Sequence, residues 1–249
     1  SFSLGGMNCA PVHLGMRELW DVYLAPFQAA IRDAGLATMM NAYPQLDGEV
    51  VAASRRILTD LLRDQLGFDG LVVSDYEAII MIHNYHFAAE TKQAAAAKAL
   101  NAGIDVELPT VVCFGEELVK AMEAGEVSLE TIDLSVSRHL QKKFELGLFE
   151  NPYVNEETVL EVFETDANRA LAYEIACQSM VLLKNDGTLP LKPTLRKLAV
   201  IGPNADAGRS LMGDYSYTAT AELLTALPNP DSVFATYSMA KASTPTVKM

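Results

Sequence analysis

Apolar positions recur at three- and four-residue steps along several stretches of the chain, which is the spacing of amphipathic helices. The clearest such stretch runs from Arg17 to Ala34 and stops at Gly35. Pro26 is expected to kink this helix or to divide it into two shorter ones. Further helices are expected at residues 50–66, 88–102, 115–124, 129–146 (with Ser128 as its N-cap) and 166–179.

Short apolar runs of strand length lie between these helices, at residues 36–41, 70–74 and 104–108. Residues 43–48, with Pro44 and the pair Asp47-Gly48, are read as a loop. The alternation of strand and helix is typical of βαβ units with a parallel sheet, and it fits a barrel and a doubly wound sheet equally well. The sequence therefore predicts an α/β fold.

The alternation is interrupted at residues 147–156, which contain Asn151-Pro152 and are read as a linker. Beyond it, the helix at residues 166–179 leads into an apolar run at residues 180–184, and residues 198–201 are predicted to be a strand. Together they begin a second α/β unit. Three strands before the linker are fewer than the eight of a complete barrel.

Composition narrows the range of partners. Half of the 249 residues are hydrophobic, 20% are charged and the net charge is -13, which opposes binding to nucleic acid or to an anionic membrane surface. Apolar runs are also shorter than the about 20 residues that cross a bilayer. A neutral substrate is the easier inference, whereas the compartment and the oligomeric state stay open.

The three cysteines, Cys9, Cys113 and Cys177, are widely spaced, which argues against a disulfide framework or a zinc site. His83 and His86 have the spacing of metal ligands but lack a nearby third ligand, so ordinary surface or core histidines are favoured. A metal site is therefore not expected.

Catalytic residues of parallel α/β folds follow the carboxyl ends of strands, which points here to residues 41–43, 74–76 and 107–109. Asp75 is the leading candidate, because a carboxylate beside an aromatic ring suits a site that cleaves sugars. Alternatively, Ser74 or Asp75 merely caps the following helix. Tyr43 either hydrogen-bonds a ligand or fills the mouth of a barrel, and Glu77 is too close to Asp75 along the chain to act as its acid/base partner.

The segment Phe-Asp-Gly-Leu-Val-Val-Ser-Asp-Tyr at residues 68–76 resembles the nucleophile segment of glycoside hydrolase family 3, the β-glucosidase and β-xylosidase family. Further stretches agree with that family in order and spacing. They lie at residues 40–43 with 47–48, 101–109, 143–149, 179–185 with 189–191, and 200–204. The resemblance extends from about residue 8 to about residue 222.

The resemblance implies the C-terminal part of a TIM-like (β/α)8 barrel over residues 1–148, a linker over 149–165 and the start of an α/β sandwich domain over 166–249. It implies a retaining exo-β-glycosidase that acts on a β-linked glucoside or a related neutral saccharide without a cofactor. Asp75 matches the family's nucleophile, Tyr76 the position of an aromatic that stacks on the sugar, and Tyr43 a tyrosine that lines the adjacent subsite.

The same resemblance implies that two parts of the family's machinery lie outside the chain. The Lys-His pair that binds sugar hydroxyls would precede Ser1, and the acid/base glutamate would follow Met249. The glutamates after the linker that match no such segment are Glu161, Glu164, Glu174 and Glu222. An internal fragment of a longer enzyme is thus expected.

Two other functions remain open. The chain is alternatively a truncated or degenerate product without catalysis and with at most residual sugar binding, because an open partial barrel leaves strand edges and an apolar interior exposed. A barrel that binds a phosphorylated metabolite is a more distant alternative, and it requires an anion site that the sequence does not show. The sugar and the linkage are not predicted.

Overall fold

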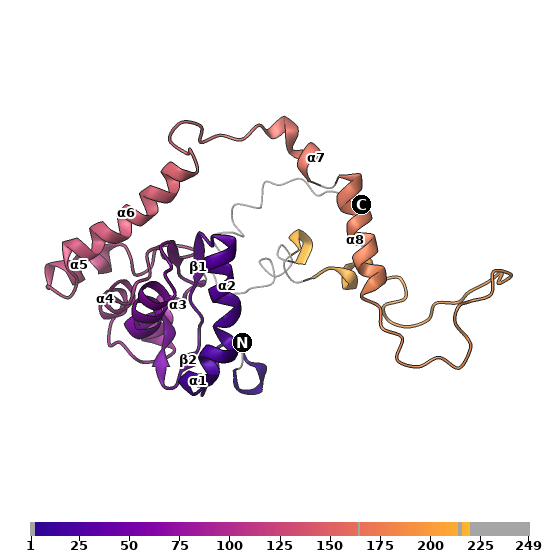
Figure 1. The fold of residues 1–249 in the computed structure, drawn as a ribbon, viewed down its shortest axis with the longest axis horizontal. Coiled ribbons are helices and arrows are strands. Elements are labelled where there is room, and N and C mark those ends of the chain that lie inside the picture. The colour runs from indigo at the N-terminus through magenta and orange to yellow at the C-terminus, as the bar shows by residue number, and fades with distance from the viewer. Residues whose placement is uncertain (1–2, 164, 214–215, 220–249) are drawn as a thin grey trace. The chain divides into compact units, whose positions relative to one another are not determined.

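The structure, a computed structural model, describes residues 3–163, 165–213 and 216–219. The chain divides into two compact units, residues 1–152 and 153–249. Figure 1 traces the chain through both units, which are described separately below.

The first unit contains most of the regular structure. Its helices are α1 (Met16–Glu18), α2 (Ala25–Ala34), α3 (Ala78–Asn84), α4 (Lys92–Ala102), α5 (Glu116–Glu123) and α6 (Leu129–Glu145). Its strands are β1 (Thr38–Met40), β2 (Gln45–Leu46), β3 (Glu49–Val50) and β4 (Leu71–Val73). Short 3-10 helices lie at Leu4–Gly6 and Val51–Ala53, and π-helical segments at Leu19–Tyr23 and Arg56–Gln65.

The helix predicted over residues 17–34 is divided, as Pro26 indicated. The π-helical segment ends at Tyr23, and α2 begins at Ala25 with Pro26 in its first turn, where the missing N–H is harmless. Gly35 ends α2 with a left-handed φ of 61°.

The loop predicted over residues 43–48 is instead a small antiparallel hairpin. Gln45 pairs with Val50 and Leu46 with Glu49. Asp47 and Gly48 both have positive φ, 52° and 83°, which is the conformation of a two-residue type I′ turn. The flanking strands are only two residues long, so their alternation is too short to be recognised in the sequence.

The parallel sheet is formed by β1 and β4. Thr38, Met39 and Met40 pair with Leu71, Val72 and Val73, respectively. A β-carbon at Gly70 would lie 2.2 Å from the Ala37 carbonyl oxygen, so glycine is needed for this approach. The strand predicted over residues 104–108 contributes only a parallel bridge between Val106 and Val73.

Helices α3 and α4 pack against each other and against the 3-10 helix at Val51–Ala53, and Figure 1 shows the two helices beside each other. Helix α3 lies outside the predicted helix ranges, and its N-cap is Glu77 rather than Ser74 or Asp75, without a side-chain hydrogen bond. Helix α4 begins at Lys92 rather than at residue 88, with the Thr91 hydroxyl as its N-cap. The buried core includes Val72, Ile79, Ile82 and Ile104 with the alanines of α4, whose small side chains permit close packing. Strand-helix alternation and a parallel sheet give the unit an α/β fold.

The free side of β1 borders an apolar cavity of about 450 Å³, whose walls include Val12, Leu19, Met39 and Leu61. Among the described residues β1 pairs only with β4.

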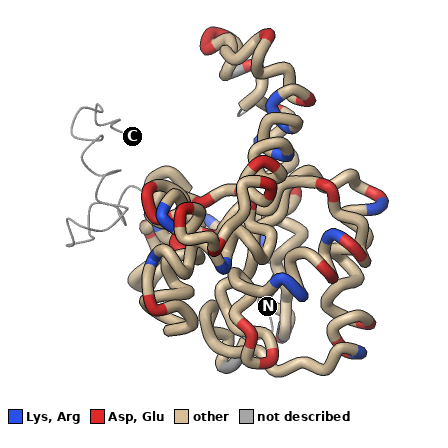
Figure 2. Tube along the Cα trace, turned by 90° about the vertical axis from the view of Figure 1, so that its left-hand side faces the viewer, with Lys and Arg blue, Asp and Glu red and all other residues tan. Residues whose placement is uncertain are grey.

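Helix α6, with 17 residues, begins after Ser128, whose hydroxyl accepts a hydrogen bond from the Thr131 amide at 3.1 Å, as predicted. None of the helices in the described ranges combines the length and the apolar character of a membrane span. Figure 2 shows acidic residues spread over helices and loops, interspersed with fewer basic ones.

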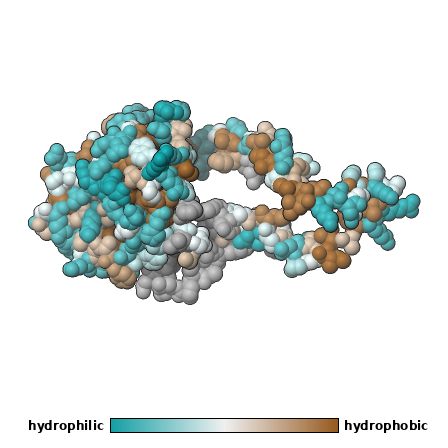
Figure 3. All heavy atoms as spheres, turned by 60° about the horizontal axis from the view of Figure 1, so that its bottom comes forward, coloured by the Kyte–Doolittle hydropathy of each residue, from teal (hydrophilic) through white to brown (hydrophobic). Residues whose placement is uncertain are grey.

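The second unit contains α7 (Val159–Val162), α8 (Asp166–Gln178) and short 3-10 helices at Glu156–Thr158 and Gly208–Leu211. Helix α8 agrees with the helix predicted there. The strand predicted at residues 198–201 is not formed, and the apolar run at residues 180–184 is not a strand either. The apolar residues of both runs are solvent-exposed (Leu183 92%, Ile201 90%). Figure 3 shows brown apolar atoms on the surface. A strand requires a hydrogen-bonded neighbour, and neither run pairs with another segment in the described residues.

Candidate active site

Three segments meet at the carboxyl end of the parallel sheet. The register of β1 against β4 sets residues 41–43 beside residues 74–76. The Ser74 amide donates to the Val106 carbonyl at 2.8 Å, and the Glu77 amide donates to the Leu108 carbonyl at 3.1 Å. The three stretches singled out in the sequence therefore converge, because parallel strands end at the same edge of a sheet.

Asp75 lies at the centre of this convergence and is partly exposed. Its Oδ1 accepts a hydrogen bond from the Tyr43 hydroxyl at 2.9 Å and another from the Tyr76 amide at 2.7 Å. Among the described residues, Oδ2 has no hydrogen-bond partner. One carboxylate oxygen is thus anchored and the other is available to a ligand.

The backbone that carries Asp75 is fixed by buried polar side chains. The amide of Asp75 donates to Oδ1 of Asn41, which is only 4% exposed, at 3.2 Å. The fully buried Ser74 accepts the Leu108 amide through Oγ at 2.8 Å. Asn41 was not chosen as a site residue, although a polar residue directly after an apolar strand is a recognisable signal.

Glu77 ends the turn after Asp75 with a φ of 64° and immediately precedes α3. A left-handed conformation is costly for a residue other than glycine and tends to occur at functional sites. The turn directs the following chain away from the sheet edge, so the carboxylate of Asp75 is presented at the start of a connection rather than within a strand.

Tyr43 crosses from the β1 side to reach Asp75. Its hydroxyl lies 2.9 Å from Asp75 Oδ1 and 2.8 Å from the Tyr76 carbonyl oxygen. A phenol has one proton, and the charged carboxylate is the stronger acceptor. Burial, and then the hydrogen bond to Asp75, raises the pKa of Tyr43 well above its usual value, so the hydroxyl remains a donor.

Tyr76 is 42% exposed and lies beside the carboxylate along the chain. An exposed aromatic face next to a carboxylate is suited to stacking against the C–H groups of a sugar ring. The structure thus brings Tyr43, Asp75 and Tyr76 together at one place.

The two histidines that were considered as metal ligands contact different parts of the chain. His83 lies in α3 and its Nδ1 is 3.0 Å from the Ala89 carbonyl oxygen, whereas His86 lies beyond the helix and its Nε2 is 3.0 Å from the Tyr43 carbonyl oxygen. Both contacts are with carbonyl groups. Within the part of the chain that the structure describes, no three His, Cys, Asp or Glu side chains are grouped as metal ligands are.

Glu107 stabilises the third of these segments, residues 107–109. Its carboxylate is buried and accepts hydrogen bonds from the backbone amides of Val112, Cys113 and Phe114 at 2.7 to 3.0 Å. A buried charge is stable only when it is satisfied in this way. The residue therefore closes the loop that follows the third segment.

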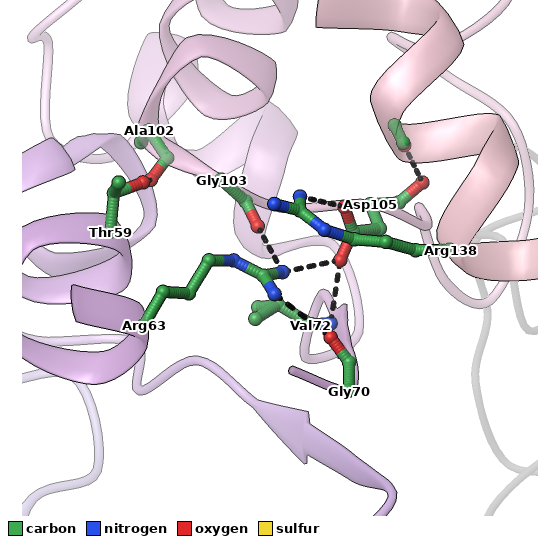
Figure 4. Close-up of polar contacts among 9 residues, drawn as sticks. Thr59, Arg63, Gly70, Val72, Ala102, Gly103, Asp105 and Arg138 are labelled. Atoms are coloured by element: carbon green, nitrogen blue, oxygen red, sulfur yellow. Dashed lines mark hydrogen bonds and ion pairs between the residues drawn. The ribbon is translucent and has the colours of Figure 1, made fainter. Parts of the chain in front are cut away.

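Asp105, two residues before Glu107, connects this part of the chain to two helices (Figure 4). Its Oδ2 lies 2.6 Å from the Arg63 guanidinium and accepts the Val72 amide at 2.9 Å, while Oδ1 lies 3.0 Å from the Arg138 guanidinium. Arg63 also donates to the Gly70 carbonyl oxygen at 2.9 Å. The network therefore joins β4, at Val72, to Asp105. Val72 lies two residues before the site residues 74–76.

The glutamates considered after the linker add nothing to this geometry. Glu161 and Glu174 are exposed residues of the second unit. Glu164 and Glu222 lie outside the described residues.

Comparisons with known proteins agree on one family. The family model described as "Glycosyl hydrolase family 3 N terminal domain" matches residues 1–141, and the model described as "Glycosyl hydrolase family 3 C-terminal domain" matches residues 180–243. A beta-xylosidase from Formosa agariphila is 35% identical over 218 residues, which is 84% of this chain and 30% of that protein. A beta-glucosidase from Rhizobium radiobacter is 38% identical over 79% of this chain and 22% of its own length.

The solved structures point the same way. The crystal structure of beta-glucosidase from Listeria innocua is similar with a TM-score of 0.70 and 34% identity, over 76% of this chain and 26% of that one. The same protein has been solved in complex with glucose. The chain thus spans less than a third of the length of these relatives, and both of its matched regions are domains of one family. The chain belongs to glycosyl hydrolase family 3.

Proposed function

We propose that this chain carries the nucleophile half of a retaining exo-β-glycosidase, β-glucosidase-like, that cleaves β-linked glucosides or related neutral saccharides. The observation that carries the proposal is Asp75, a carboxylate at a parallel strand end with one oxygen anchored and the other without a partner among the described residues. Family membership and relatives named beta-glucosidase and beta-xylosidase support it.

In this proposal the carboxylate attacks the anomeric carbon, a C–O bond forms, and the bond to the leaving oxygen breaks. Oδ2 is the attacking atom, because Oδ1 already accepts hydrogen bonds from Tyr43 and Tyr76. These two donors fix the carboxylate plane and so direct the lone pairs of Oδ2. Water then hydrolyses the glycosyl ester and Asp75 is regenerated as a carboxylate.

The roles of the two tyrosines follow from their geometry. Tyr43 keeps its proton, so it donates a hydrogen bond to Asp75 in the free enzyme and can turn to the Tyr76 carbonyl when the carboxylate becomes an ester. Tyr76 stacks on the sugar with its exposed ring. A neutral sugar also fits the acidic chain, which disfavours anionic substrates.

The proposal extends to the architecture. Residues 1–148 would be part of a TIM-like (β/α)8 barrel, and residues 166–249 the start of an α/β sandwich domain, joined by residues 149–165. The parallel pair β1–β4 and the bridge at Val106 support three neighbouring positions in such a barrel. The acid/base residue would come from elsewhere in the enzyme.

Mechanism-based labelling tests the nucleophile. A 2-deoxy-2-fluoro-β-glucoside with an aryl leaving group should become covalently attached to Asp75 in the intact enzyme, since such a leaving group needs no protonation. Peptide mapping locates the label, and Asp75→Asn should prevent it. Label on another carboxylate would refute the assignment.

The competing function is a non-catalytic product with residual sugar binding. It is less favoured, because the matched relatives have glycosidase names. Turnover of an aryl β-glucoside by the purified 249-residue chain, abolished by Asp75→Ala, would exclude it. Absence of turnover together with sugar binding would support it instead.

A further inference from the structure

His86 has a rigid backbone although it lies in a connection between helices. Its amide donates to the Met81 carbonyl at 2.8 Å, and the Ala88 amide donates to the Ile82 carbonyl at 2.9 Å. Between them Phe87 has a left-handed φ of 51°, which turns the chain back toward α3. Lys98 Nζ also donates to the Ala88 carbonyl. These hydrogen bonds therefore hold the backbone that carries the His86 imidazole.

The imidazole makes two polar contacts with the segment after β1. Its Nε2 lies 3.0 Å from the Tyr43 carbonyl oxygen, and its Nδ1 lies 3.4 Å from Nε2 of the Gln45 side chain. A carbonyl oxygen only accepts and an amide nitrogen only donates, so Nε2 carries the proton and Nδ1 is bare. The contacts thus define one neutral tautomer.

The electrostatic surroundings agree with that tautomer. Burial lowers the pKa of His86, and the hydrogen bond to the Tyr43 carbonyl opposes this only in part. The ring of Tyr85 packs edge-on against the imidazole with 4.9 Å between ring centroids. The ring orientation is therefore fixed by packing as well as by hydrogen bonds.

Tyr43 is consequently held at both ends. Its carbonyl is bound by His86, and its hydroxyl contacts Oδ1 of Asp75. The phenol reaches the carboxylate from a short segment between β1 and β2, so a rotation at its backbone would displace the hydroxyl. A displacement of about 1 Å near reacting atoms lowers rates by up to a hundredfold.

We propose that His86 is a positioning residue of the glycosidase site, which clamps the Tyr43 carbonyl and so aims the Tyr43 hydroxyl at Asp75. The inference rests on the proposed function, since Asp75 is its nucleophile. His86 touches neither substrate nor Asp75 and acts only through Tyr43.

The test compares covalent labelling of Asp75 in three variants of the full chain with the wild type. His86→Leu removes both polar contacts and should lower the maximal labelling rate constant about tenfold to a hundredfold, with less than a twofold change in the half-saturating concentration. His86→Gln retains an amide that can donate to the Tyr43 carbonyl and should recover most of the rate. His83→Gln, in α3 just before that connection, is the matched control and should label like the wild type.

If any change of a histidine in this region lowered labelling by disturbing the structure, His83→Gln would be slowed as well. His86→Gln would then fail to recover the rate. Equal rates for His86→Leu and the wild type would overturn the proposal. So would a failure of His86→Gln to recover any rate in a variant whose circular dichroism matches that of the wild type.

Nitrogen-15 NMR of histidine-labelled protein provides a readout that does not depend on activity. The His86 resonances, identified by their loss in His86→Gln, should be those of a neutral ring protonated at Nε2, and the Tyr43 ring resonances should shift in His86→Leu. A ring protonated at Nδ1 would overturn the clamp. Label found on a carboxylate other than Asp75, with the expected NMR result, would refute the proposed function and leave the clamp on Tyr43 supported.

Discussion

The Tyr43 hydroxyl and Oδ1 of Asp75 lie 2.9 Å apart, although 32 positions separate the two residues in the chain. The contact exists because β1 and β4 pair in parallel, so that the segments following them leave the sheet side by side. It occupies the same carboxylate oxygen as the Tyr76 amide, and the other oxygen has no hydrogen-bond partner among the described residues.

Replacement of Tyr43 by phenylalanine removes this donor and preserves the ring. A hydrogen bond to a charged group contributes about 1.5–3 kcal/mol, so the maximal rate of Asp75 labelling should fall about tenfold to a hundredfold. Tyr153→Phe alters an exposed tyrosine of the second unit and should change nothing. An unchanged rate in Tyr43→Phe would show that the hydroxyl does not orient the nucleophile.

The raised pKa of Tyr43 predicts a loss of stability in alkali. Burial, and then the hydrogen bond to Asp75, raises the folded-state pKa above the ordinary tyrosine value of about 10. The folded state then binds the proton more tightly than the unfolded state, so its stability falls as the pH rises above about 10. Urea midpoints measured across that range should fall less in Tyr43→Phe than in the wild type. Parallel curves would contradict the shift.

The ion-pair network at Asp105 should be the most sensitive polar element of the first unit. Asp105→Ala leaves the guanidiniums of Arg63 and Arg138 without their carboxylate, and the loss of one partner from a buried pair costs about 3–5 kcal/mol. Denaturant unfolding followed by circular dichroism measures it. Asp33→Ala, which breaks an exposed pair with Arg32, is the control and should leave the midpoint unchanged.

Local patterns were sufficient to locate the elements on which the site depends. An apolar run followed by a polar residue identified β1 and β4, and the position of Pro26 identified the break before α2. The convergence of residues 41–43, 74–76 and 107–109 required only the rule that parallel strands share one carboxyl edge. The grouping of Asp75, Tyr43 and Tyr76 in space could therefore be predicted from the sequence.

Long-range side-chain contacts were not accessible in the same way. The sequence favours an ordinary surface or core histidine at position 86, because no third metal ligand lies near His83 and His86. The partner of His86, the Tyr43 carbonyl, is a backbone atom 43 positions away and leaves no pattern in the sequence. Asn41 binds the backbone amide of Asp75, 34 positions away, which no spacing reveals. The strand predicted at residues 198–201 of the second unit is not formed for a different reason. An apolar run becomes a strand only beside a hydrogen-bonding neighbour.

Gly70 offers a test of the approach between β1 and β4. An alanine there would set its β-carbon 2.2 Å from the Ala37 carbonyl oxygen, which the structure accommodates only by moving one strand. Gly70→Ala should therefore lower the free energy of unfolding by about 1–3 kcal/mol and should also slow Asp75 labelling. Gly15→Ala, where no heavy atom lies within 4 Å of the added carbon, should do neither. Wild-type stability in Gly70→Ala would contradict the close approach.

The loop closed by Glu107 can be monitored through Cys113. The thiol is fully buried, and burial followed by the charge of Glu107 raises its pKa to about 12, so it should react with a thiol reagent only when the loop opens. Glu107→Gln removes one acceptor oxygen from the backbone amides of residues 112–114 and directs an amide group at them instead. Modification of Cys113 should accelerate about fivefold or more, in line with about 1–3 kcal/mol for unsatisfied buried donors.

Two comparisons make this result specific to the loop. The exposed Cys177 is an internal reference, because its reaction rate should be the same in wild type and variant. Glu145→Gln, which changes a carboxylate paired with Lys142 at the end of α6, should leave the Cys113 rate unaltered. If Cys113 reacts equally slowly in Glu107→Gln, the carboxylate does not hold the loop. Its hydrogen bonds with the amides of residues 112–114 then contribute little to closing the segment beside Asp75.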